Sequence, residues 1–161
     1  MITCTFENGN IAYPGLRHVT IGAICFNDKN EVLLVKRSEK FSRPGTYTLP
    51  GGFLDRDETT TEAALRELQE EGGYSGEVVG LFHVNDNPGR PKEDRQNVDF
   101  VYLVKMGEGS FAANDEITSA EWFDKNSLPP EDEFAFDHRK TLLKFFEYQE
   151  HPFLLPLVGK L

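Results

Sequence analysis

Apolar and β-branched side chains fall in short runs along the chain, and turn-forming residues separate the runs. The segment HVTIGAICF at 18–26 is rich in such residues, which is typical of a buried strand. The segment EVLLVKR at 31–37 follows a turn at 28–30 and predicts a second strand. Further strands are expected at 47–49, 76–84, 98–105 and 120–123.

Two other segments have the residue spacing of amphipathic helices. The first begins at Thr59, where Glu62 completes a capping box, and it ends at the glycine pair 72–73. Its buried stripe consists of Ala64, Leu65 and Leu68. The second is expected to be capped by Asp137, and its apolar residues lie on or near its buried face: Leu142, Leu143, Phe145 and Phe146. This order of elements predicts an α/β fold in which helices cover both sides of a mixed sheet.

The first helix carries carboxylates at neighbouring positions of one face, Glu67, Glu70 and Glu71. Like charges at this spacing repel, and those near the helix end also oppose the negative pole of its dipole. A bound divalent cation would remove both costs, whereas most acidic helix faces are simply solvated. The preceding loop favours the metal site, because the pair Gly51–Gly52 can turn sharply and expose a carbonyl, and another acid, Glu58, follows it.

The spacing of these residues matches a known pattern. From Gly52, five residues lead to Glu58 and seven more lead to Arg66, after which Glu67-Leu68-Gln69-Glu70-Glu71-Gly72-Gly73-Tyr74 follows. This segment resembles the Nudix box of the Nudix (MutT-like) hydrolases, with Tyr74 where an aliphatic residue is more usual. Its flanks resemble the family more loosely over residues 18–130. The resemblance implies a Nudix α/β/α sandwich with a mixed β-sheet, formed by a single domain over residues 1–161.

The resemblance also implies a metal site and its members. The ligands of Mg²⁺ or Mn²⁺ would be the Gly51 carbonyl and the carboxylates of Glu67, Glu70 and Glu71. Arg66 would pair with a helix glutamate and orient it, while Glu58 would be a weaker ligand or lie just behind the ligands. Carboxylate and carbonyl oxygens are the donors that hard divalent cations prefer.

Members of this family hydrolyse a nucleoside diphosphate that is linked to another group. The implied cations would stabilise charge on the phosphate oxygens and lower the pKa of a bound water. A carboxylate would then take up the proton of that water. Glu67 within the box and Glu116 downstream are comparable candidates for this base, and Glu108 is a weaker one.

Basic residues outside the box are candidates for phosphate binding. The polar loop 85–96 carries Arg90, Lys92 and Arg95, which either grip phosphates or are solvated. Arg37 ends a predicted strand beside the box and is a further candidate. These positions bear on the substrate rather than on the metal.

Aromatic residues offer a second set of substrate contacts. Tyr47, Phe41 and Phe53 either stack on a base or pack in the core. The polar loop 85–96, together with the segment 134–138, looks similar to Nudix enzymes that act on ADP-ribose and related dinucleotides. The substrate that the resemblance implies is therefore a small nucleotide.

Three functions remain open at this stage. The first is metal-dependent hydrolysis of ADP-ribose or a related (di)nucleotide. The second is cleavage of nucleoside triphosphates, including oxidised ones, to monophosphate and pyrophosphate. The third is a non-catalytic regulatory module that binds nucleotides, against which the retention of the acidic residues of the box argues: Glu58, Glu67, Glu70 and Glu71.

Length, charge and cysteine content restrict the size of the core, the kind of partner and the cellular compartment. A chain of 161 residues suits one sizeable core. Its net charge of −10 argues against long nucleic acid as a partner but not against a small nucleotide. No apolar run is long enough for a membrane span, and no secretory signal is visible at the start. Cys4 and Cys25 have no metal-type spacing, and we expect reduced thiols in a cytoplasmic protein.

The remaining candidates carry no clear chemistry. His83 and His138 have no partner pattern typical of nucleophilic catalysis, and both are expected to be structural. The tail at 151–161 is apolar but interrupted by Pro152 and Pro156. It suits either packing on the core or a contact between the subunits of a homodimer, and the sequence leaves both open.

Overall fold

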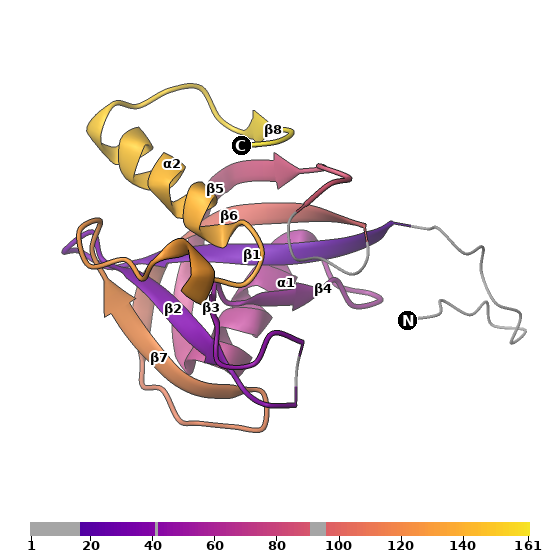
Figure 1. Ribbon diagram of the computed structural model, residues 1–161, viewed down its shortest axis with the longest axis vertical. Helices are drawn as coiled ribbons and strands as arrows, with labels where there is room; N and C mark the ends of the chain where they lie inside the picture. Colours follow the sequence, from indigo (N-terminus) through magenta and orange to yellow (C-terminus); the bar gives the residue numbers. More distant parts are fainter. Residues whose placement is uncertain (1–16, 41, 91–95) are drawn as a thin grey trace, which may run out of the picture.

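A mixed sheet of eight strands organises the molecule, whose computed structural model describes residues 17–40, 42–90 and 96–161 (Figure 1). The strands are β1 (His18–Phe26), β2 (Val32–Arg37), β3 (Tyr47–Thr48), β4 (Gly51–Phe53), β5 (Tyr74–Asn85), β6 (Asn97–Gly109), β7 (Ile117–Phe123) and β8 (Leu157–Val158). Their order is β3-β2-β1-β6-β5-β8, with β4 paired to β1 and β7 to β2. β1 runs parallel to β6 and antiparallel to β2, so the expected mixed sheet is confirmed.

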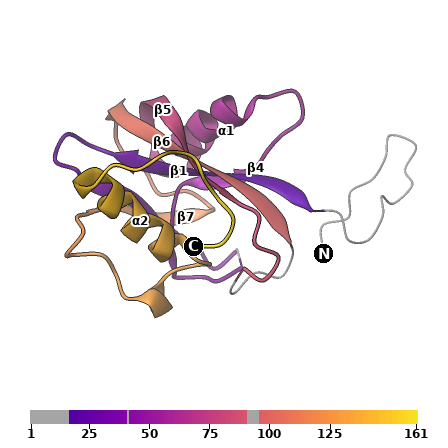
Figure 2. The same ribbon diagram turned by 90° about the horizontal axis from the view of Figure 1, so that it is seen from above.

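The two α-helices, α1 (Thr60–Glu67) and α2 (His138–Glu150), cover opposite faces of this sheet (Figure 2). On the α1 side the helix buries Ala63, Ala64 and, just after it, Leu68. On the α2 side the buried helix residues are Leu142, Phe145 and Phe146. The α/β/α sandwich predicted from the sequence is the observed architecture. A short 3₁₀ turn, η2 (Glu131–Glu133), precedes α2.

The start of the first helix and its end at the glycine pair 72–73 follow the sequence expectation, but the form of its last turn does not. The Thr59 hydroxyl accepts from the Glu62 N–H, and the Glu62 carboxylate accepts from the Thr59 N–H, so the predicted capping box is present. After Glu67 the helix widens into a π-helical turn, η1 (Leu68–Gly72). Gly73 then ends it in the left-handed conformation with φ 77°, where a Cβ would lie 2.3 Å from the Ser110 carbonyl oxygen.

Two short strands were not anticipated. β4 contains the glycine pair and pairs with β1, with Gly51 opposite Gly22. A Cβ at Gly51 would lie 2.2 Å from the Ile21 carbonyl oxygen, so only glycine fits at this crossing. β8 runs parallel to β5 at the end of the sheet. Both strands depend on pairing between distant segments, and neither has a pattern of its own in the sequence.

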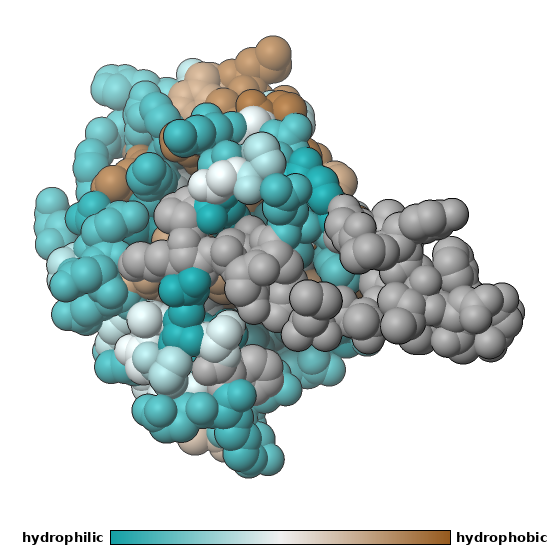
Figure 3. Space-filling model, turned by 45° about the vertical axis from the view of Figure 1, so that its right-hand side comes forward, coloured by the Kyte–Doolittle hydropathy of each residue, from teal (hydrophilic) through white to brown (hydrophobic). Residues whose placement is uncertain are grey.

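The C-terminal segment packs partly on the core. Leu155 and Leu157 lie against the apolar cluster beneath α2, whereas Leu154 and Val158 are largely exposed. Figure 3 shows a mainly hydrophilic surface with a hydrophobic area at the upper end, where Figure 1 places the C-terminal segment. Core packing, one of the two alternatives for the tail, is therefore present, and the other alternative, a homodimer, stays a prediction.

Three further sequence expectations concern Leu143, the cysteines and membrane-spanning helices. Leu143 was expected on or near the buried face but is 37% exposed, because the buried face consists of its neighbours Leu142, Phe145 and Phe146. Cys25 is a buried free thiol, and Cys4 lies outside the described residues. Within the described ranges no helix has the length and apolar character required to span a membrane.

Candidate active site

A cavity of about 560 Å³ opens at β4 and the C-terminal part of α1, a volume suited to a nucleotide-sized ligand. The residues proposed from the sequence that line it are Arg37, Gly51, Phe53, Arg66, Glu67, Glu70, Glu71, Arg90 and Glu116. Residues far apart in the chain therefore meet in one space. Arg95, Lys92 and Phe41, also proposed from the sequence, lie outside the described residues.

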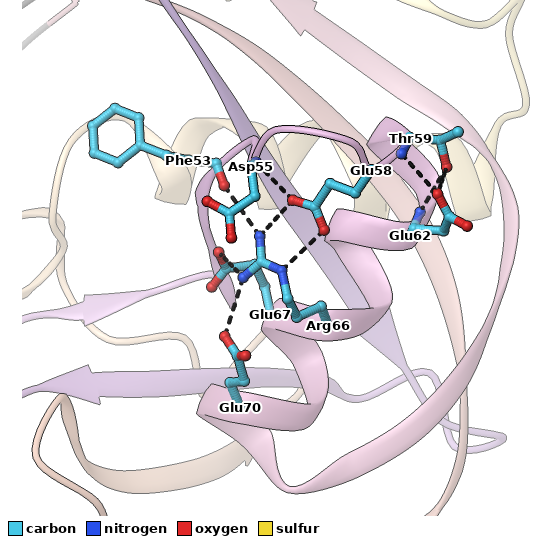
Figure 4. A network of polar contacts seen from close by, with 8 residues as sticks. All are labelled: Phe53, Asp55, Glu58, Thr59, Glu62, Arg66, Glu67 and Glu70. Atoms are coloured by element: carbon cyan, nitrogen blue, oxygen red, sulfur yellow. Dashed lines mark hydrogen bonds and ion pairs between the residues drawn. The ribbon is translucent and has the colours of Figure 1, made fainter. Parts of the chain in front are cut away.

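Arg66 occupies the centre of the acidic end of this cavity (Figure 4). Its Nε and Nη2 donate to the two carboxylate oxygens of Glu58 at 3.0 and 2.7 Å. Its Nη1 donates to Glu67 at 2.8 Å and to Glu70 at 3.1 Å, and Nη2 also reaches the Phe53 carbonyl at 3.1 Å. Arg66 thus holds two helix glutamates and the preceding loop in one arrangement.

Glu58 acts on the site through Arg66. One of its oxygens also accepts the Asp55 N–H at 2.7 Å, so both carboxylate oxygens are engaged. The hydrogen bonds from Arg66 hold the pKa of Glu58 below its ordinary value. Among the described residues that line the cavity Glu58 is absent, and its contacts suit a residue that positions Arg66.

Glu71 is the most deeply placed carboxylate of the cluster. It is 6% exposed, and one oxygen accepts the Gly51 N–H at 2.8 Å. Burial raises its pKa to about 8, and the charges of Glu67 and Glu116 act in the same direction. Within the described part of the chain no lysine or arginine forms an ion pair with it. The π-helical turn η1 places Glu71 inward, a feature the α-helical spacing did not predict.

Glu67 lies beside Glu71 and directly beneath the glycine loop. It is 7% exposed, and burial raises its pKa while Arg66 partly offsets that effect. A Cβ on Gly52 would lie 2.4 Å from Glu67 Oε1, so glycine at this position gives the carboxylate its space. The geometry explains why the loop before the helix carries glycine here.

The donor set suits a hard divalent cation. The cluster offers carboxylate oxygens from Glu67, Glu70 and Glu71, and two of these groups are buried with raised pKa values. Among the described residues no three side chains already stand in ligand geometry. The reason is visible in the contacts: Arg66 holds Glu67 and Glu70, and the Gly51 N–H holds Glu71. A cation would compensate the buried charge that these contacts leave uncompensated.

Glu116 and Arg37 line another part of the cavity wall. Glu116 is exposed, and its backbone is fixed by the Ser38 N–H, which donates to its carbonyl at 2.8 Å. Arg37 donates from Nε to the Ser42 carbonyl at 2.8 Å. Burial lowers the pKa of Arg37, and the charges of Glu71 and Glu116 oppose this shift. Arg37 is therefore within electrostatic reach of the glutamate cluster.

Arg90 lies at the end of the cavity formed by the start of α2. It is nearly buried, and its guanidinium contacts Asp137 at 2.6 Å and Asp99 at 3.0 Å. The Asp137 carboxylate, expected to cap α2, accepts from Arg90 and Asn85 and makes no capping hydrogen bond. Asp99 lines the cavity without a motif that would have marked it, and His138 lines it although the sequence analysis expected this residue to be structural.

Tyr47, proposed as a substrate contact, belongs to the core. The centroid of its ring lies 5.4 Å from that of the Phe123 ring, and its hydroxyl donates to Glu121 at 3.0 Å. The described residues that line the cavity do not include Tyr47, because β3 directs its side chain into the apolar cluster beneath α2. Of the two roles considered for this residue, the structure favours packing. Phe53, in contrast, lines the cavity and is 36% exposed.

Comparison with known proteins agrees with this geometry. A family model described as NUDIX domain matches residues 16–145 of the chain. The chain is 34% identical over 120 residues to an ADP-ribose pyrophosphatase of Methanocaldococcus jannaschii, a match that covers 74% of this chain and 68% of that protein. The resemblance drawn from the Nudix box is thereby confirmed.

Two further proteins are similar over most of this chain. The 8-oxo-dGDP phosphatase NUDT18 of Mus musculus is 32% identical over 140 residues, which cover 83% of this chain but only 41% of that protein. A crystal structure of a NUDIX hydrolase from Nitrosomonas europaea has a TM-score of 0.77 at 25% identity, covering 98% of this chain and 85% of that one. The fold of this chain is therefore shared with a solved NUDIX hydrolase.

Proposed function

The chain belongs to the NUDIX family and is one of its pyrophosphohydrolases, and from this premise we propose that its substrate is a nucleoside diphosphate linked to another group, with ADP-ribose first. The similarity to an ADP-ribose pyrophosphatase supports this substrate. The proposal includes Mg²⁺ or Mn²⁺ as the cofactor.

The observation that carries the proposal is the pair of buried carboxylates Glu67 and Glu71 in a nucleotide-sized cavity. Both have raised pKa values because they are buried, and Arg66 and the Gly51 N–H fix their positions. The Gly51 carbonyl and the carboxylates of Glu67, Glu70 and Glu71 would hold a divalent cation, which would neutralise charge on the diphosphate and lower the pKa of a water. Buried, fixed carboxylates without this use would be a net cost to the fold.

The chain's own residues perform the proton transfer. Water adds to one phosphorus, the anhydride P–O bond breaks, and a carboxylate takes up the proton that the water loses. Glu67 suits this role because its side chain lines the cavity and Arg66 orients its carboxylate. Glu116 is the second candidate, since it lines the same cavity and is exposed to solvent. From ADP-ribose the products are AMP and ribose 5-phosphate.

A second substrate class is favoured by a specific similarity. The chain is 32% identical to an 8-oxo-dGDP phosphatase over 140 residues. An oxidised nucleoside diphosphate carries the same diphosphate as ADP-ribose, so the glutamate cluster would serve both. The two classes differ in the base and in the group beyond the second phosphate.

Product analysis tests the proposal. The protein is incubated with ADP-ribose, 8-oxo-dGDP, 8-oxo-dGTP and NADH, each with and without Mg²⁺. Formation of AMP and ribose 5-phosphate only in the presence of Mg²⁺ is the expected result. Preferred cleavage of 8-oxo-dGDP would instead assign oxidised nucleoside diphosphates as the substrate class.

Matched variants separate catalysis from stability. Glu70→Gln removes a carboxylate from the cluster and should lower turnover by orders of magnitude while the fold is kept. Glu77→Gln, on an exposed position of β5, is the control and should behave as the unmodified protein. An unmodified protein that is folded, binds nucleotide and cleaves none of the substrates would favour the non-catalytic module instead.

A further inference from the structure

His138, the first residue of α2, lies in the wall of the cavity although it is only 7% exposed. Its Nδ1 accepts a hydrogen bond from the Leu49 N–H at 3.2 Å and lies 2.8 Å from the Thr48 hydroxyl. A ring nitrogen that accepts from a backbone amide carries no proton. The proton of the neutral imidazole is therefore on Nε2.

The surroundings keep His138 in this neutral form. Burial lowers its pKa to about 4, and the positive charge of Arg90 acts in the same direction. The imidazole is then uncharged over the physiological pH range, with the tautomer fixed by Leu49. It is a hydrogen-bond donor of defined direction and no net charge.

Among the residues that the structure describes, that donor has no hydrogen-bond partner. Within the described ranges Nε2 of His138 makes no hydrogen bond, whereas Nδ1 makes the contacts to β3 and Leu49. Because the His138 ring lines the cavity, its N–H is available to a group that enters the cavity. A nearly buried donor without a partner is costly, and a ligand acceptor would remove that cost.

Charged groups of both signs surround His138. The two carboxylates of Asp99 and Asp137 contact the guanidinium of Arg90, and the charges of Arg90 and Arg37 also act on the imidazole. The donor of His138 is itself uncharged, so its matching partner is an uncharged acceptor. The Phe136 ring completes the wall, with its centroid 5.6 Å from that of His138.

Phe136 has a strained backbone conformation, and guanidinium groups lie against its ring. Its φ of 55° is rare for a bulky residue and costly unless the surroundings enforce it. The guanidinium of Arg90 lies 5.2 Å from the ring centroid, and that of Arg43 lies 5.6 Å from it. The ring and the imidazole thus form a fixed surface with a single neutral donor.

The part of the cavity that is lined by α1 and η1 is acidic. Glu67, Glu70 and Glu71 supply the carboxylates there, and Figure 2 shows α1 and α2 on opposite faces of the sheet. The charge of Arg37 acts on both Glu71 and His138, so Arg37 is within electrostatic reach of both groups. A substrate with its diphosphate at the glutamates and Arg37 would extend its uncharged part toward His138.

We propose that His138 recognises the nucleoside of the substrate: its Nε2–H donates to an uncharged acceptor, either on the base or on the sugar. This proposal rests on the proposed function in that the ligand is a nucleotide. His138 is a specificity-determining residue here and takes no part in the proton transfer to water.

Two substitutions separate the two nitrogens. In His138→Asn the Oδ1 atom can replace Nδ1 as the acceptor for the Leu49 N–H, but the donor at the Nε2 position is lost. In His138→Gln the terminal amide can replace the Nε2–H donor. Loss of one neutral hydrogen bond to a ligand corresponds to roughly a tenfold loss of affinity. His138→Asn should therefore bind AMP about tenfold more weakly, and His138→Gln should retain more of the affinity.

The measurement is calorimetric titration of the full chain with AMP and with ribose 5-phosphate in Mg²⁺ buffer, with melting temperatures as the check on folding. Weaker binding of AMP alone assigns the acceptor to the base, and weaker binding of both ligands assigns it to the sugar. Unchanged affinity of His138→Asn for both ligands would overturn the proposal. With ADP-ribose as substrate, the Asn variant should show a raised KM and a nearly unchanged kcat.

A spectroscopic readout is independent of catalysis and of the variants. In ¹⁵N-labelled unmodified protein, the His138 Nε2 signal should have the shift of a protonated nitrogen and should move when AMP is added. A signal that stays in place at saturating AMP would contradict the proposal. If the protein binds AMP through His138 but cleaves no diphosphate, the proposed function fails while this inference stands.

Discussion

Arg66 and Glu58 form a two-point ion pair, in which Nε and Nη2 of the arginine contact the two carboxylate oxygens at 3.0 and 2.7 Å. This pair links the loop after β4 to α1, and it leaves Nη1 free to donate to Glu67 and Glu70. Arginine is suited to the position because its planar guanidinium offers several donors in fixed directions. One residue therefore sets the positions of Glu67 and Glu70 relative to the loop.

Replacement of Arg66 by lysine should separate the effect of the positive charge from the effect of the guanidinium's hydrogen-bond geometry. Lysine keeps the charge, but a single ammonium group cannot hold Glu58 by two points and also reach Glu67 and Glu70. We expect kcat for ADP-ribose to fall by about ten- to a hundredfold, the usual range for residues that orient metal ligands. Steady-state kinetics at saturating Mg²⁺ would measure the effect. Activity equal to that of the unmodified protein would show that the two-point pair is dispensable.

Local spacing made much of this end of the site predictable. Glu67, Glu70 and Glu71 are near neighbours in the sequence, and helical geometry alone puts them together. The π-helical turn η1 was not predictable, because it depends on the packing of Leu68 and Gly72 against the sheet rather than on residue spacing. The deep burial of Glu71 was missed for the same reason.

Gly52→Ala should disable the site with little effect on the rest of the fold. The added Cβ would lie 2.4 Å from Glu67 Oε1, so the carboxylate or the loop has to move. We expect turnover to fall by at least roughly tenfold, because displacements near 1 Å at a reacting group have large effects. Gly80→Ala is the control, since nothing lies within 4 Å of a Cβ there. Comparable kcat values for the two variants would contradict the proposed role of Glu67.

The other end of the site depends on contacts that span much of the chain. Arg90 was proposed from the sequence as a phosphate contact, because a loop arginine shows no sign of its partners. In the structure Asp99 comes from β6 and Asp137 from the residue before α2, and both contact the guanidinium. No local pattern contains such a pairing, and the same holds for β4 and β8, whose partners are distant strands. The sheet's other strands were predicted, though β5, β6 and β7 begin or end beyond the expected positions.

The stability of the metal-free protein should depend on the protonation of Glu71. Its pKa is raised from 4.5 to about 8 in the folded state, so folding favours the protonated form. This stabilisation is complete below pH 4.5, the pKa of the glutamate in the unfolded state, and it is lost as the pH rises through about 8. The melting temperature in the presence of EDTA should therefore fall between pH 6 and pH 9. Glu71→Gln, which cannot ionise, should reduce this dependence, and a dependence as steep as in the unmodified protein would assign it to other groups.

Tyr47→Phe should affect stability and leave substrate binding unchanged. The substitution removes the hydroxyl that donates to Glu121 but keeps the ring in the core beside Phe123. We expect a loss of about 1 kcal/mol in the free energy of unfolding, which is typical of one neutral-to-charged hydrogen bond that is partly exposed. Urea denaturation measures this loss, and KM for ADP-ribose serves as the second readout. A severalfold rise in KM would indicate that Tyr47 contacts the substrate.

The identity of the base can be decided by comparing Glu67→Gln with Glu116→Gln. Glu67 lies against Arg66 and the glycine loop, whereas Glu116 is exposed and is held only through its backbone. A base that accepts the proton of water must be ionised before the reaction, so its loss removes the acid limb of the pH profile of kcat/KM. Loss of that limb in Glu116→Gln, with the limb retained in Glu67→Gln, would assign the proton transfer to Glu116 and leave Glu67 to the metal.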